Sequence, residues 1–347
     1  MTRVGTSPFG SLTRRDVMVG LAALGASVAL PGAVRAQSVT KAARIDVHRH
    51  FLTPETVGSG YLSEPAFKRW TLESMLAEMD RGGVSAAMLS PTTQLLSATA
   101  GGGQIAPPHY RRCNDYAAQL VAESKGRFGF FAGIPLEDTH ASLVEIAYAF
   151  DVLKADGVSV FTSYGNRWLG NASFDPVFAE LNRRRALIFA HPVAASCCSQ
   201  LIPEVNDNQI AFGTDTSYAI ASMILTGASQ RFPDLRMIFC HGGGTMPFLI
   251  RRFVTDAASP RMSKLLPNGF MPEFQRFYYD IAQIPMRPPL LAFKEVAPMS
   301  HILFGTDYPF RTAAEHATGL EESRVFDSRE LRAIDTNTAL LVPRFKT

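Results

Sequence analysis

The sequence predicts a (β/α)8 barrel, in which eight parallel strands alternate with helices that cover them. Short runs that are apolar throughout recur at eight places, as is typical of parallel strands buried on both faces. Segments with helical spacing of apolar residues separate these runs, so strand and helix alternate strictly. The chain has 347 residues, and a barrel of this kind needs roughly 250.

The predicted strands are short, and helical segments separate them. Three of these segments, residues 72–79, 143–150 and 177–181, repeat apolar residues three and four positions apart, and several end at Gly or before Pro. In chain order, the expected strands are residues 43–50, 84–91, 127–134, 157–162, 186–192, 236–243, 277–283 and 302–309.

The first predicted strand ends in His48-Arg49-His50. Residues i and i+2 of a strand lie on the same face, so the two imidazoles should point at one spot. Arg49 should point away from that spot and pack into the structure.

Three later strands also reach a histidine or an aspartate near their ends: His191 on the fifth, His241 on the sixth and Asp307 on the eighth. The carboxyl ends of barrel strands meet at one face, where imidazole and carboxylate groups can converge on a divalent ion. The pattern predicts a mononuclear metal site. Solvated or capping roles are expected for the histidines elsewhere: His109, His140, His301 and His316.

Composition excludes several classes of protein. With 46% hydrophobic and 19% charged residues, the chain can bury a large core and is neither disordered nor fibrous. The formal net charge is +3, and the basic residues are interspersed, which gives no indication of nucleic-acid binding.

The four cysteines form no C-x-x-C motif. We expect Cys113, Cys197, Cys198 and Cys240 to be free and mostly buried, since the adjacent pair is awkward to bridge. Cys240 next to His241 suggests a nucleophile and its base, but neighbouring strand residues point to opposite faces.

The first 36 residues resemble a bacterial twin-arginine export signal. Arg14-Arg15 precedes an apolar stretch, residues 19–30, and small residues up to Ala36 suit a signal peptidase. The alternative is a membrane anchor, but the stretch is shorter than the roughly 20 residues that cross a bilayer. We therefore expect a periplasmic protein, residues 37–347, with no stable membrane association after cleavage.

Several motifs resemble the amidohydrolase superfamily, in its decarboxylase-type branch typified by aminocarboxymuconate-semialdehyde, 6-methylsalicylate and resorcylate decarboxylases. The resemblance extends from Ala43 to the end of the chain. The matching segments are Ile45-Asp46-Val47-His48-Arg49-His50-Phe51, Ala190-His191-Pro192, His241-Gly242-Gly243-Gly244 with Pro247, and Phe304-Gly305-Thr306-Asp307-Tyr308-Pro309.

The resemblance implies a TIM barrel of the metal-dependent hydrolase type with a defined set of ligands. It makes His48, His50, His191 and Asp307 the metal ligands and places His241 beside them as an acid–base or water-orienting group. The fourth predicted strand lacks the lysine that bridges two metals in binuclear relatives, so one ion is expected. Export after folding lets the metal be chosen in the cytoplasm, which leaves zinc and manganese open.

The implied activity is non-oxidative decarboxylation of a hydroxylated aromatic or unsaturated carboxylic acid, with Asp307 as the candidate proton donor. Hydrolysis of a lactone or ester is the alternative, and a non-catalytic periplasmic binding protein is a third reading. The loop at residues 99–110 is either a mobile lid or a plain connector. Candidate walls of an aromatic substrate slot are Phe51, Tyr164, Trp168 and Phe310.

A carboxylate substrate needs a cation, and the resemblance points to Arg252, eleven residues after His241. In this branch an arginine reaches across a dimer interface into the neighbouring active site, where its fork can bind a carboxylate. A homodimer or higher homo-oligomer is therefore expected. The alternative role for Arg252 is a surface salt bridge.

Replacing both Arg14 and Arg15 with lysine should leave the precursor in the cytoplasm, because the twin-arginine route depends on the arginine pair. Unaltered protein should appear in the periplasm and begin at Gln37, as measured by mass spectrometry after cell fractionation. Full-length protein in the inner membrane would show an anchor instead.

Overall fold

The computed structural model describes residues 44–58, 65–68, 70–92, 96 and 105–346. The predicted export signal and residues 99–104 of the glycine-rich loop lie outside these ranges. Within them, no helix has both the length and the apolar character needed to cross a membrane.

Eight parallel strands form the barrel, and their order in the sheet follows their order in the chain. Beyond the last strand the chain returns to the first: Val47 N–H donates to the Phe304 carbonyl (2.9 Å) and His50 N–H to the Tyr308 carbonyl (2.8 Å). The predicted (β/α)8 barrel is therefore confirmed. The strands are β1 (Arg44–His50), β2 (Val84–Ser90), β3 (Phe128–Gly133), β4 (Gly157–Phe161), β7 (Leu187–His191), β8 (Arg236–Phe239), β9 (Tyr278–Asp280) and β10 (Ile302–Leu303).

All eight predicted strands are present, but three of them, β8, β9 and β10, end at least three residues earlier than the sequence suggested. Strand β8 stops at Phe239 and β10 at Leu303. His241 (φ 56°) and Asp307 (φ 64°) then adopt left-handed backbone conformations, which a strand cannot contain. These two side chains therefore lie on turns beyond their strands.

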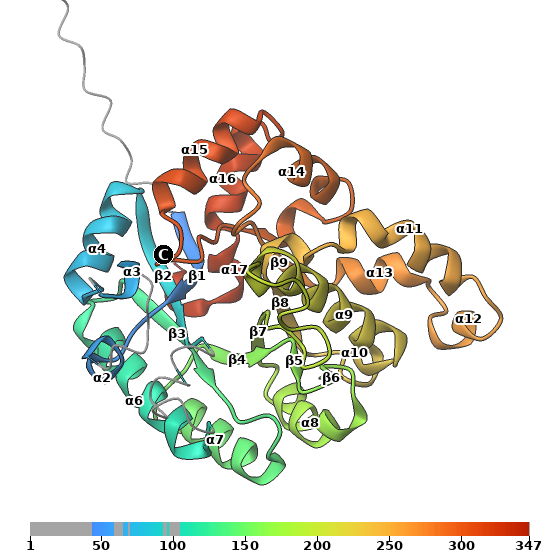
Figure 1. The fold of residues 1–347 in the computed structure, drawn as a ribbon, viewed down its shortest axis with the longest axis horizontal. Coiled ribbons are helices and arrows are strands. Elements are labelled where there is room, and N and C mark those ends of the chain that lie inside the picture. Colours follow the sequence, from blue (N-terminus) through green and yellow to red (C-terminus); the bar gives the residue numbers. More distant parts are fainter. Residues whose placement is uncertain (1–43, 59–64, 69, 93–95, 97–104, 347) are drawn as a thin grey trace, which may run out of the picture. The chain divides into compact units, whose positions relative to one another are not determined.

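Helices surround the strands (Figure 1), and the three predicted from spacing correspond to α4, α7 and α8. A short hairpin of β5 (Ser163–Tyr164) and β6 (Arg167–Trp168) follows β4. The helices are α2 (Pro54–Gly58), α3 (Pro65–Lys68), α4 (Leu72–Arg81), α6 (Pro107–Glu123), α7 (Thr139–Asp151), α8 (Asp175–Arg183), α9 (Ala211–Leu225), α10 (Ala228–Arg231), α11 (Met246–Ala257), α12 (Met262–Leu265), α13 (Phe270–Gln275), α14 (Arg287–Lys294), α15 (Ala313–Ser323), α16 (Ser328–Thr336) and α17 (Thr338–Leu341).

Helix α4 shows why these segments fold as they do. The Thr71 hydroxyl accepts the Ser74 N–H (3.0 Å), and the Ser74 hydroxyl accepts the Thr71 N–H (2.8 Å), so two unpaired donors of the first turn are satisfied. Met75 and Met79, one turn apart, are fully buried on the inner face. Capping starts the helix, and burial of this stripe fixes its orientation on the sheet.

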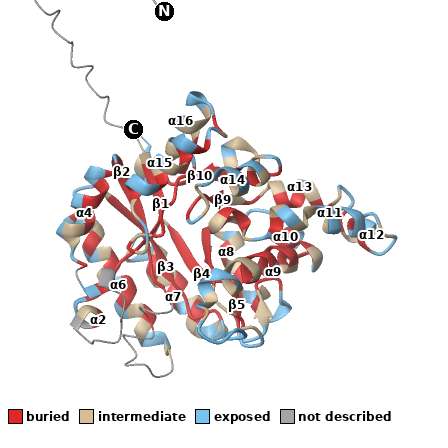
Figure 2. Cartoon of the chain, turned by 45° about the horizontal axis from the view of Figure 1, so that its top comes forward, coloured by how far each residue is buried: buried red, intermediate tan, exposed pale blue. Residues whose placement is uncertain are grey.

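The core has two parts, and the strands that separate them are buried on both faces (Figure 2). One part lies between strands and helices, and the other fills the barrel. Inside the barrel the rings of Phe131 and Phe189 stack with centroids 5.1 Å apart. Phe189 also contacts the ring of His48 at 4.9 Å, so the predicted metal site rests on an apolar floor.

Arg49 is fully buried and points away from His48 and His50, as the strand alternation predicts. Its Nε donates to Asp46 Oδ2 (2.6 Å), and its Nη2 lies 2.5 Å from Glu78 Oε2 on α4. Asp46 also accepts the backbone N–H of Thr306 (3.1 Å), and Glu78 accepts that of Ala313 at the start of α15 (2.6 Å). One buried guanidinium thus connects β1, α4 and the chain that follows β10.

Two of the four cysteines differ from the sequence-based expectation. Cys113 and Cys240 are buried and free, as expected. Cys197 and Cys198 lie at the surface after β7 and are joined in a disulfide, so the expectation of free thiols is wrong for this pair. The exposed turn that contains them brings neighbouring side chains together, which an extended strand would not do.

Arg49→Ala should lower the free energy of unfolding by about 3–5 kcal/mol, because it leaves the carboxylates of Asp46 and Glu78 buried without their cation. Urea unfolding of the metal-free mature protein measures this loss. The control is Arg183→Ala, which removes a largely exposed ion pair with Glu180 and should change stability by less than about 1 kcal/mol. Equal losses in the two variants would contradict a structural role for the buried network.

Candidate metal centre and active site

Four side chains from three parts of the barrel meet at the carboxyl ends of its strands. His48 and His50 come from β1, His191 from β7 and Asp307 from the turn after β10. Their candidate ligand atoms all lie within 4.8 Å of one another, and each residue is 6% exposed or less. The structure brings together the four residues that the sequence predicted as ligands.

The nitrogen atoms of this cluster face one another. His48 Nε2 lies 3.2 Å from His50 Nε2, and both lie close to Asp307 Oδ1, at 3.2 and 3.0 Å respectively. The Nε2 atom of His191 is buried and has no hydrogen-bond partner in the described structure. Three imidazole nitrogens and a carboxylate oxygen directed at one point, one of them without a partner, fit a divalent metal ion.

Each of the three imidazoles is held through its Nδ1 atom. His48 Nδ1 donates to Asp280 Oδ2 (2.8 Å) and His191 Nδ1 to the Pro192 carbonyl (2.9 Å). His50 Nδ1 lies 3.1 Å from the Ser90 carbonyl. A proton on Nδ1 leaves the Nε2 lone pair of each ring available to a metal, so these contacts select the tautomer that a ligand needs.

Asp280 is a functional residue that the sequence analysis missed. It is fully buried at the end of β9, where Oδ2 accepts from His48 and Oδ1 accepts the backbone N–H groups of His241 (2.9 Å) and Ala282 (3.0 Å). The same signal that identified the ligands was present, because the predicted strand at residues 277–283 contains this aspartate. Asp280 therefore holds the ring of His48, one of the four predicted ligands, in its orientation.

Electrostatics of the cluster favour a positive charge between the rings. Burial by itself would lower the pKa of His48, but the acidic groups Cys240, Asp280 and Asp307 raise that pKa well above its ordinary value. Burial would likewise raise the pKa of Asp307, yet the neighbouring imidazoles, led by His48, hold it well below its usual range.

The remaining two imidazoles resist protonation. Burial and the neighbouring His50 and His48 rings hold the pKa of His191 well below the ordinary value. Burial also lowers the pKa of His50. The cluster therefore combines an ionised carboxylate with two neutral imidazoles, His50 and His191, which is the ligand form that divalent metals bind. His48 would have to lose its proton when a metal ion binds.

His241 lies beside the cluster and outside the set of four ligands. Its Nε2 is 3.5 Å from Asp307 Oδ2, and its ring centroid is 5.3 Å from that of His48. Gly242, Gly243 and Gly244 all have positive φ, which lets the backbone turn sharply behind His241. This position suits the predicted role of a group that exchanges or orients a proton at Asp307.

The second carboxylate oxygen of Asp307 is also held. The side-chain amide of Gln283 donates to Asp307 Oδ2 (2.8 Å), and Arg311 Nε donates to Gln283 Oε1 (3.3 Å). The sequence analysis named neither residue, because Gln283 belongs to a turn whose conformation no local pattern predicts.

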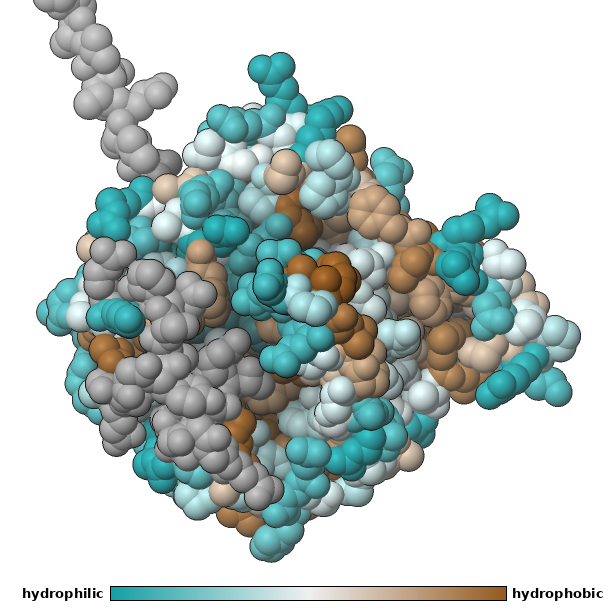
Figure 3. Space-filling model, in the orientation of Figure 1, coloured by the Kyte–Doolittle hydropathy of each residue, from teal (hydrophilic) through white to brown (hydrophobic). Residues whose placement is uncertain are grey.

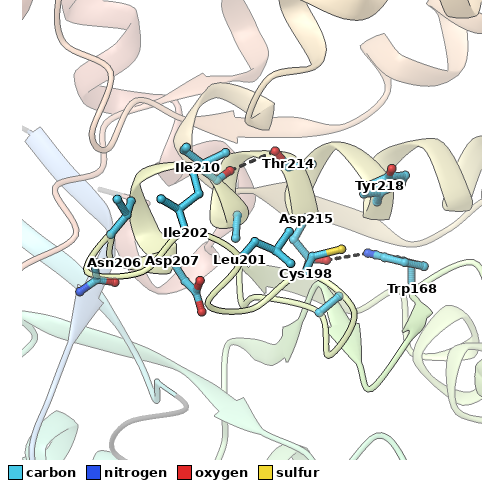
Figure 4. Close-up of a pocket in the computed structure, with 13 residues that line it drawn as sticks. Trp168, Cys198, Leu201, Ile202, Asn206, Asp207, Ile210, Thr214, Asp215 and Tyr218 are labelled. Atoms are coloured by element: carbon cyan, nitrogen blue, oxygen red, sulfur yellow. Dashed lines mark hydrogen bonds between the residues drawn. The ribbon is translucent and has the colours of Figure 1, made fainter.

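Of the four aromatic residues proposed to line a substrate slot, Phe310 lies next to the metal cluster. Its ring is 6.1 Å from that of His50. Phe51 and Tyr164 are buried in the core that lies between strands and helices. Trp168 lies at another place, where its Nε1 donates to Asp215 (2.6 Å) and its ring packs on Tyr218 (Figure 4).

Arg252 is exposed on α11. It lines a hollow of about 470 Å³ between α9 and α11, and it forms no ion pair with a carboxylate among the residues that the structure describes.

Comparison with known proteins adds to this geometry. The family model described as Amidohydrolase matches residues 45–336. The 6-methylsalicylic acid decarboxylase of Penicillium expansum is 34% identical over 329 residues, which cover 88% of this chain and 97% of that protein. Decarboxylase macB of Penicillium terrestre is 31% identical over 324 residues, with 87% and 96% covered.

Solved structures share the fold at lower identity. The 2,6-dihydroxybenzoate decarboxylase in complex with 2,6-dihydroxybenzoate aligns with a TM-score of 0.72 at 20% identity and covers 88% of this chain and 99% of its own. A dihydroxybenzoic acid decarboxylase from Polaromonas with bound manganese gives a TM-score of 0.70 at 19% identity, with 88% and 98% covered.

Asp280→Asn should weaken binding of a divalent metal by about 10- to 100-fold, because the amide no longer accepts the His48 Nδ1 proton as strongly. His191→Ala should abolish tight binding, since it removes a ligand. Competition with a chromophoric chelator measures both affinities. Asp234→Asn, at an exposed carboxylate, is the control and should bind metal normally. An unchanged affinity in Asp280→Asn would exclude its orienting role.

Proposed function

The chain belongs to the amidohydrolase family, and on this basis we propose that it is a metal-dependent, non-oxidative decarboxylase of a hydroxylated aromatic or unsaturated carboxylic acid. One observation carries the proposal. A complete, buried set of His48, His50, His191 and Asp307 occurs in a chain that matches a 6-methylsalicylic acid decarboxylase along almost its whole length. The small-molecule acid is the partner that this chemistry requires.

The proposed cofactor is one divalent ion, zinc or manganese. Strand β4, Gly157–Phe161, supplies no lysine that could bridge a second ion. The other group of potential ligands, His48, Cys240 and Asp280, shares His48 with the first, and its Asp280 already accepts the His48 Nδ1 proton. Imidazole and carboxylate ligands suit both metals.

The bound metal would supply a Lewis acid that polarises oxygens of the substrate. The residues of the chain then transfer one proton to the substrate. Asp307 is ionised in the cluster, so it must first take up a proton, and it then passes that proton to the ring carbon that carries the carboxylate. The carbon–carbon bond breaks, its electron pair stays with the ring, and carbon dioxide leaves without a redox cofactor. His241, 3.5 Å from Asp307 Oδ2, is placed to return the proton or to orient the substrate.

Apolar rings cover the predicted ligands His48 and His50. Phe189 closes the barrel side of His48, and Phe310 packs against both His50 and Phe67, whose ring centroid is 5.1 Å away. A site that excludes water strengthens the electrostatic contacts within it. The rim at Phe310 is also the place where an aromatic acid could stack.

The proposal also includes a periplasmic location, for which residues 1–36 are the support. Export by the twin-arginine pathway would deliver the barrel folded and carrying its metal.

We further propose that the working unit is a dimer or a higher assembly, in which Arg252 of one chain completes the carboxylate site of the next. The support is a groove along α9, formed by the 470 Å³ hollow and an adjoining pocket of about 250 Å³. Exposed apolar side chains border this groove, among them Leu201 (70% exposed), Ile210 (57%) and Tyr218 (51%) (Figure 4). Hydrophobic residues also gather over α9 and α11 in Figure 3. An apolar surface of this kind typically marks a protein contact.

The decarboxylase proposal predicts release of carbon dioxide from at least one member of a panel of salicylates and resorcylates. His241→Ala should retain metal, as measured by elemental analysis, and lose about 100-fold or more in turnover. Metal-depleted protein is the matched control and should be inactive. Hydrolysis of lactones or esters without decarboxylation would instead identify a hydrolase, and binding of acids without any metal-dependent product would identify a binding protein.

Mixing two inactive variants tests the shared site. Arg252→Ala and His241→Ala should each lack detectable turnover, since loss of a bidentate partner for a carboxylate costs on the order of 2–5 kcal/mol. Mixed dimers should regain part of the activity, because one interface then combines an intact arginine with an intact histidine. No recovery in confirmed mixed dimers would place Arg252 outside the neighbouring site.

A further inference from the structure

Three side chains form a polar path from the metal cluster to the surface. Asp307 is 6% exposed, whereas Gln283 and Arg311 are both exposed. Gln283 donates from Nε2 to Asp307 Oδ2 (2.8 Å) and accepts at Oε1 from Arg311 Nε (3.3 Å). The guanidinium of Arg311 therefore stands at the open rim of the active site, one side chain away from the carboxylate that carries the proposed proton.

The backbone holds Gln283 in place. Its φ of 62° lies in the left-handed region, which residues other than glycine rarely adopt. Its backbone N–H donates to Nε2 of His316 (3.1 Å), and Nδ1 of His316 donates to the Thr312 carbonyl (3.0 Å). His316 is 1% exposed, so the expectation of a solvated or capping histidine is wrong for this residue. An imidazole buried under the rim fixes the residue that contacts Asp307.

Arg311 has no carboxylate partner in the ranges that the structure describes. Glu315, four residues after Arg311, uses its carboxylate to accept the backbone N–H (2.8 Å) and the hydroxyl (2.9 Å) of Thr312 and so caps α15. The Gln283 amide lies between Arg311 and Asp307. Among the described residues Arg311 donates a hydrogen bond through Nε alone, so its two terminal nitrogens are available to bind another group.

The position of Arg311 next to Phe310 in the chain indicates which kind of ligand the guanidinium would bind. Phe310, the preceding residue, directs its ring toward His50 at 6.1 Å and toward Phe67 at 5.1 Å. An aromatic acid that stacks at this ring would bring an oxygen at its edge to the guanidinium. Guanidinium groups bind such anionic oxygens through two parallel hydrogen bonds.

We propose that Arg311, supported by Gln283, is a specificity-determining residue that binds a carboxylate oxygen of the aromatic acid in its own chain's active site. This inference rests on the proposed decarboxylase function and names the residue that distinguishes the acid from its decarboxylated product. It differs from the role of Arg252, which would come from a neighbouring chain.

The experiment compares an acid with the phenol that it becomes on loss of carbon dioxide. Calorimetry on the metal-loaded mature protein measures the binding of 2,6-dihydroxybenzoate and of resorcinol. Arg311→Ala should weaken binding of the acid about tenfold or more and leave resorcinol binding within about twofold, because only the acid has a charged partner for the guanidinium. KM for turnover of the acid should rise in proportion, with little change in kcat.

Two further variants separate recognition from folding. Arg329→Ala removes an exposed arginine on α16 and should leave both affinities unchanged. Arg311→Lys should recover part of the acid affinity, since it restores charge without the fork. A role limited to holding Gln283 would instead lower kcat in both Arg311→Ala and Gln283→Ala and leave the acid affinity intact, which would overturn the inference.

The remaining outcomes keep this inference distinct from the proposed function. Unchanged acid affinity in Arg311→Ala, an equal loss for resorcinol, or no binding of 2,6-dihydroxybenzoate by the unaltered protein would each overturn it, even if some acid is decarboxylated. Arg311-dependent binding of the acid by a protein that decarboxylates nothing would support the recognition role and reject the proposed reaction.

Discussion

The buried contact between Arg49 and Asp46 is the constraint on which the active site depends. Asp46 binds the guanidinium with one oxygen (2.6 Å) and accepts the backbone N–H of His48 (3.0 Å) and of Thr306 (3.1 Å) with the other. It therefore joins the strand that carries two of the four predicted metal ligands to the turn that carries Asp307. The barrel closes at this seam, where β10 contributes only two residues of regular strand. Without the ion pair, the seam would retain a few backbone hydrogen bonds and two unpaired buried carboxylates.

The alternation of side chains along β1 lets one short segment serve both purposes. His48 and His50 face the cluster, and Arg49 between them faces the layer between strands and helices, where Glu78 provides its second carboxylate. A shift of the strand by one residue would exchange the imidazoles and the guanidinium. The charge network on the outer face therefore fixes the strand register that the metal site needs. The guanidinium of Arg49, which stabilises the fold, also points away from the metal ion that the site would bind.

The fold and the cluster of four candidate ligands could be predicted from the sequence because both follow from short-range rules. Apolar runs separated by helical spacing give the barrel, and barrel geometry brings strand ends together, which places His48, His50 and His191 correctly. Asp280 could have been found by the same rule. Gln283 and Arg311 could not, since their positions depend on a left-handed turn and on a buried histidine 33 residues away. The disulfide between Cys197 and Cys198 was missed for a similar reason, because a surface turn sets the directions of both side chains.

His241 and Asp307, the two residues assigned to proton transfer, share an unusual local structure. Each follows a short strand and has a positive φ, at 56° and 64°, so the turn and not the strand determines where its side chain points. Each is also fixed by its backbone N–H: that of His241 donates to Asp280 Oδ1 (2.9 Å), and that of Asp307 donates to the His48 carbonyl (2.9 Å). Backbone conformations of this kind persist only where the surroundings hold them. Here the surroundings are β1 and Asp280, the same elements that orient the metal ligands. The groups that bind the metal and the groups that move the proton are therefore positioned by one set of contacts, and a change that displaces His48 would displace both functions together.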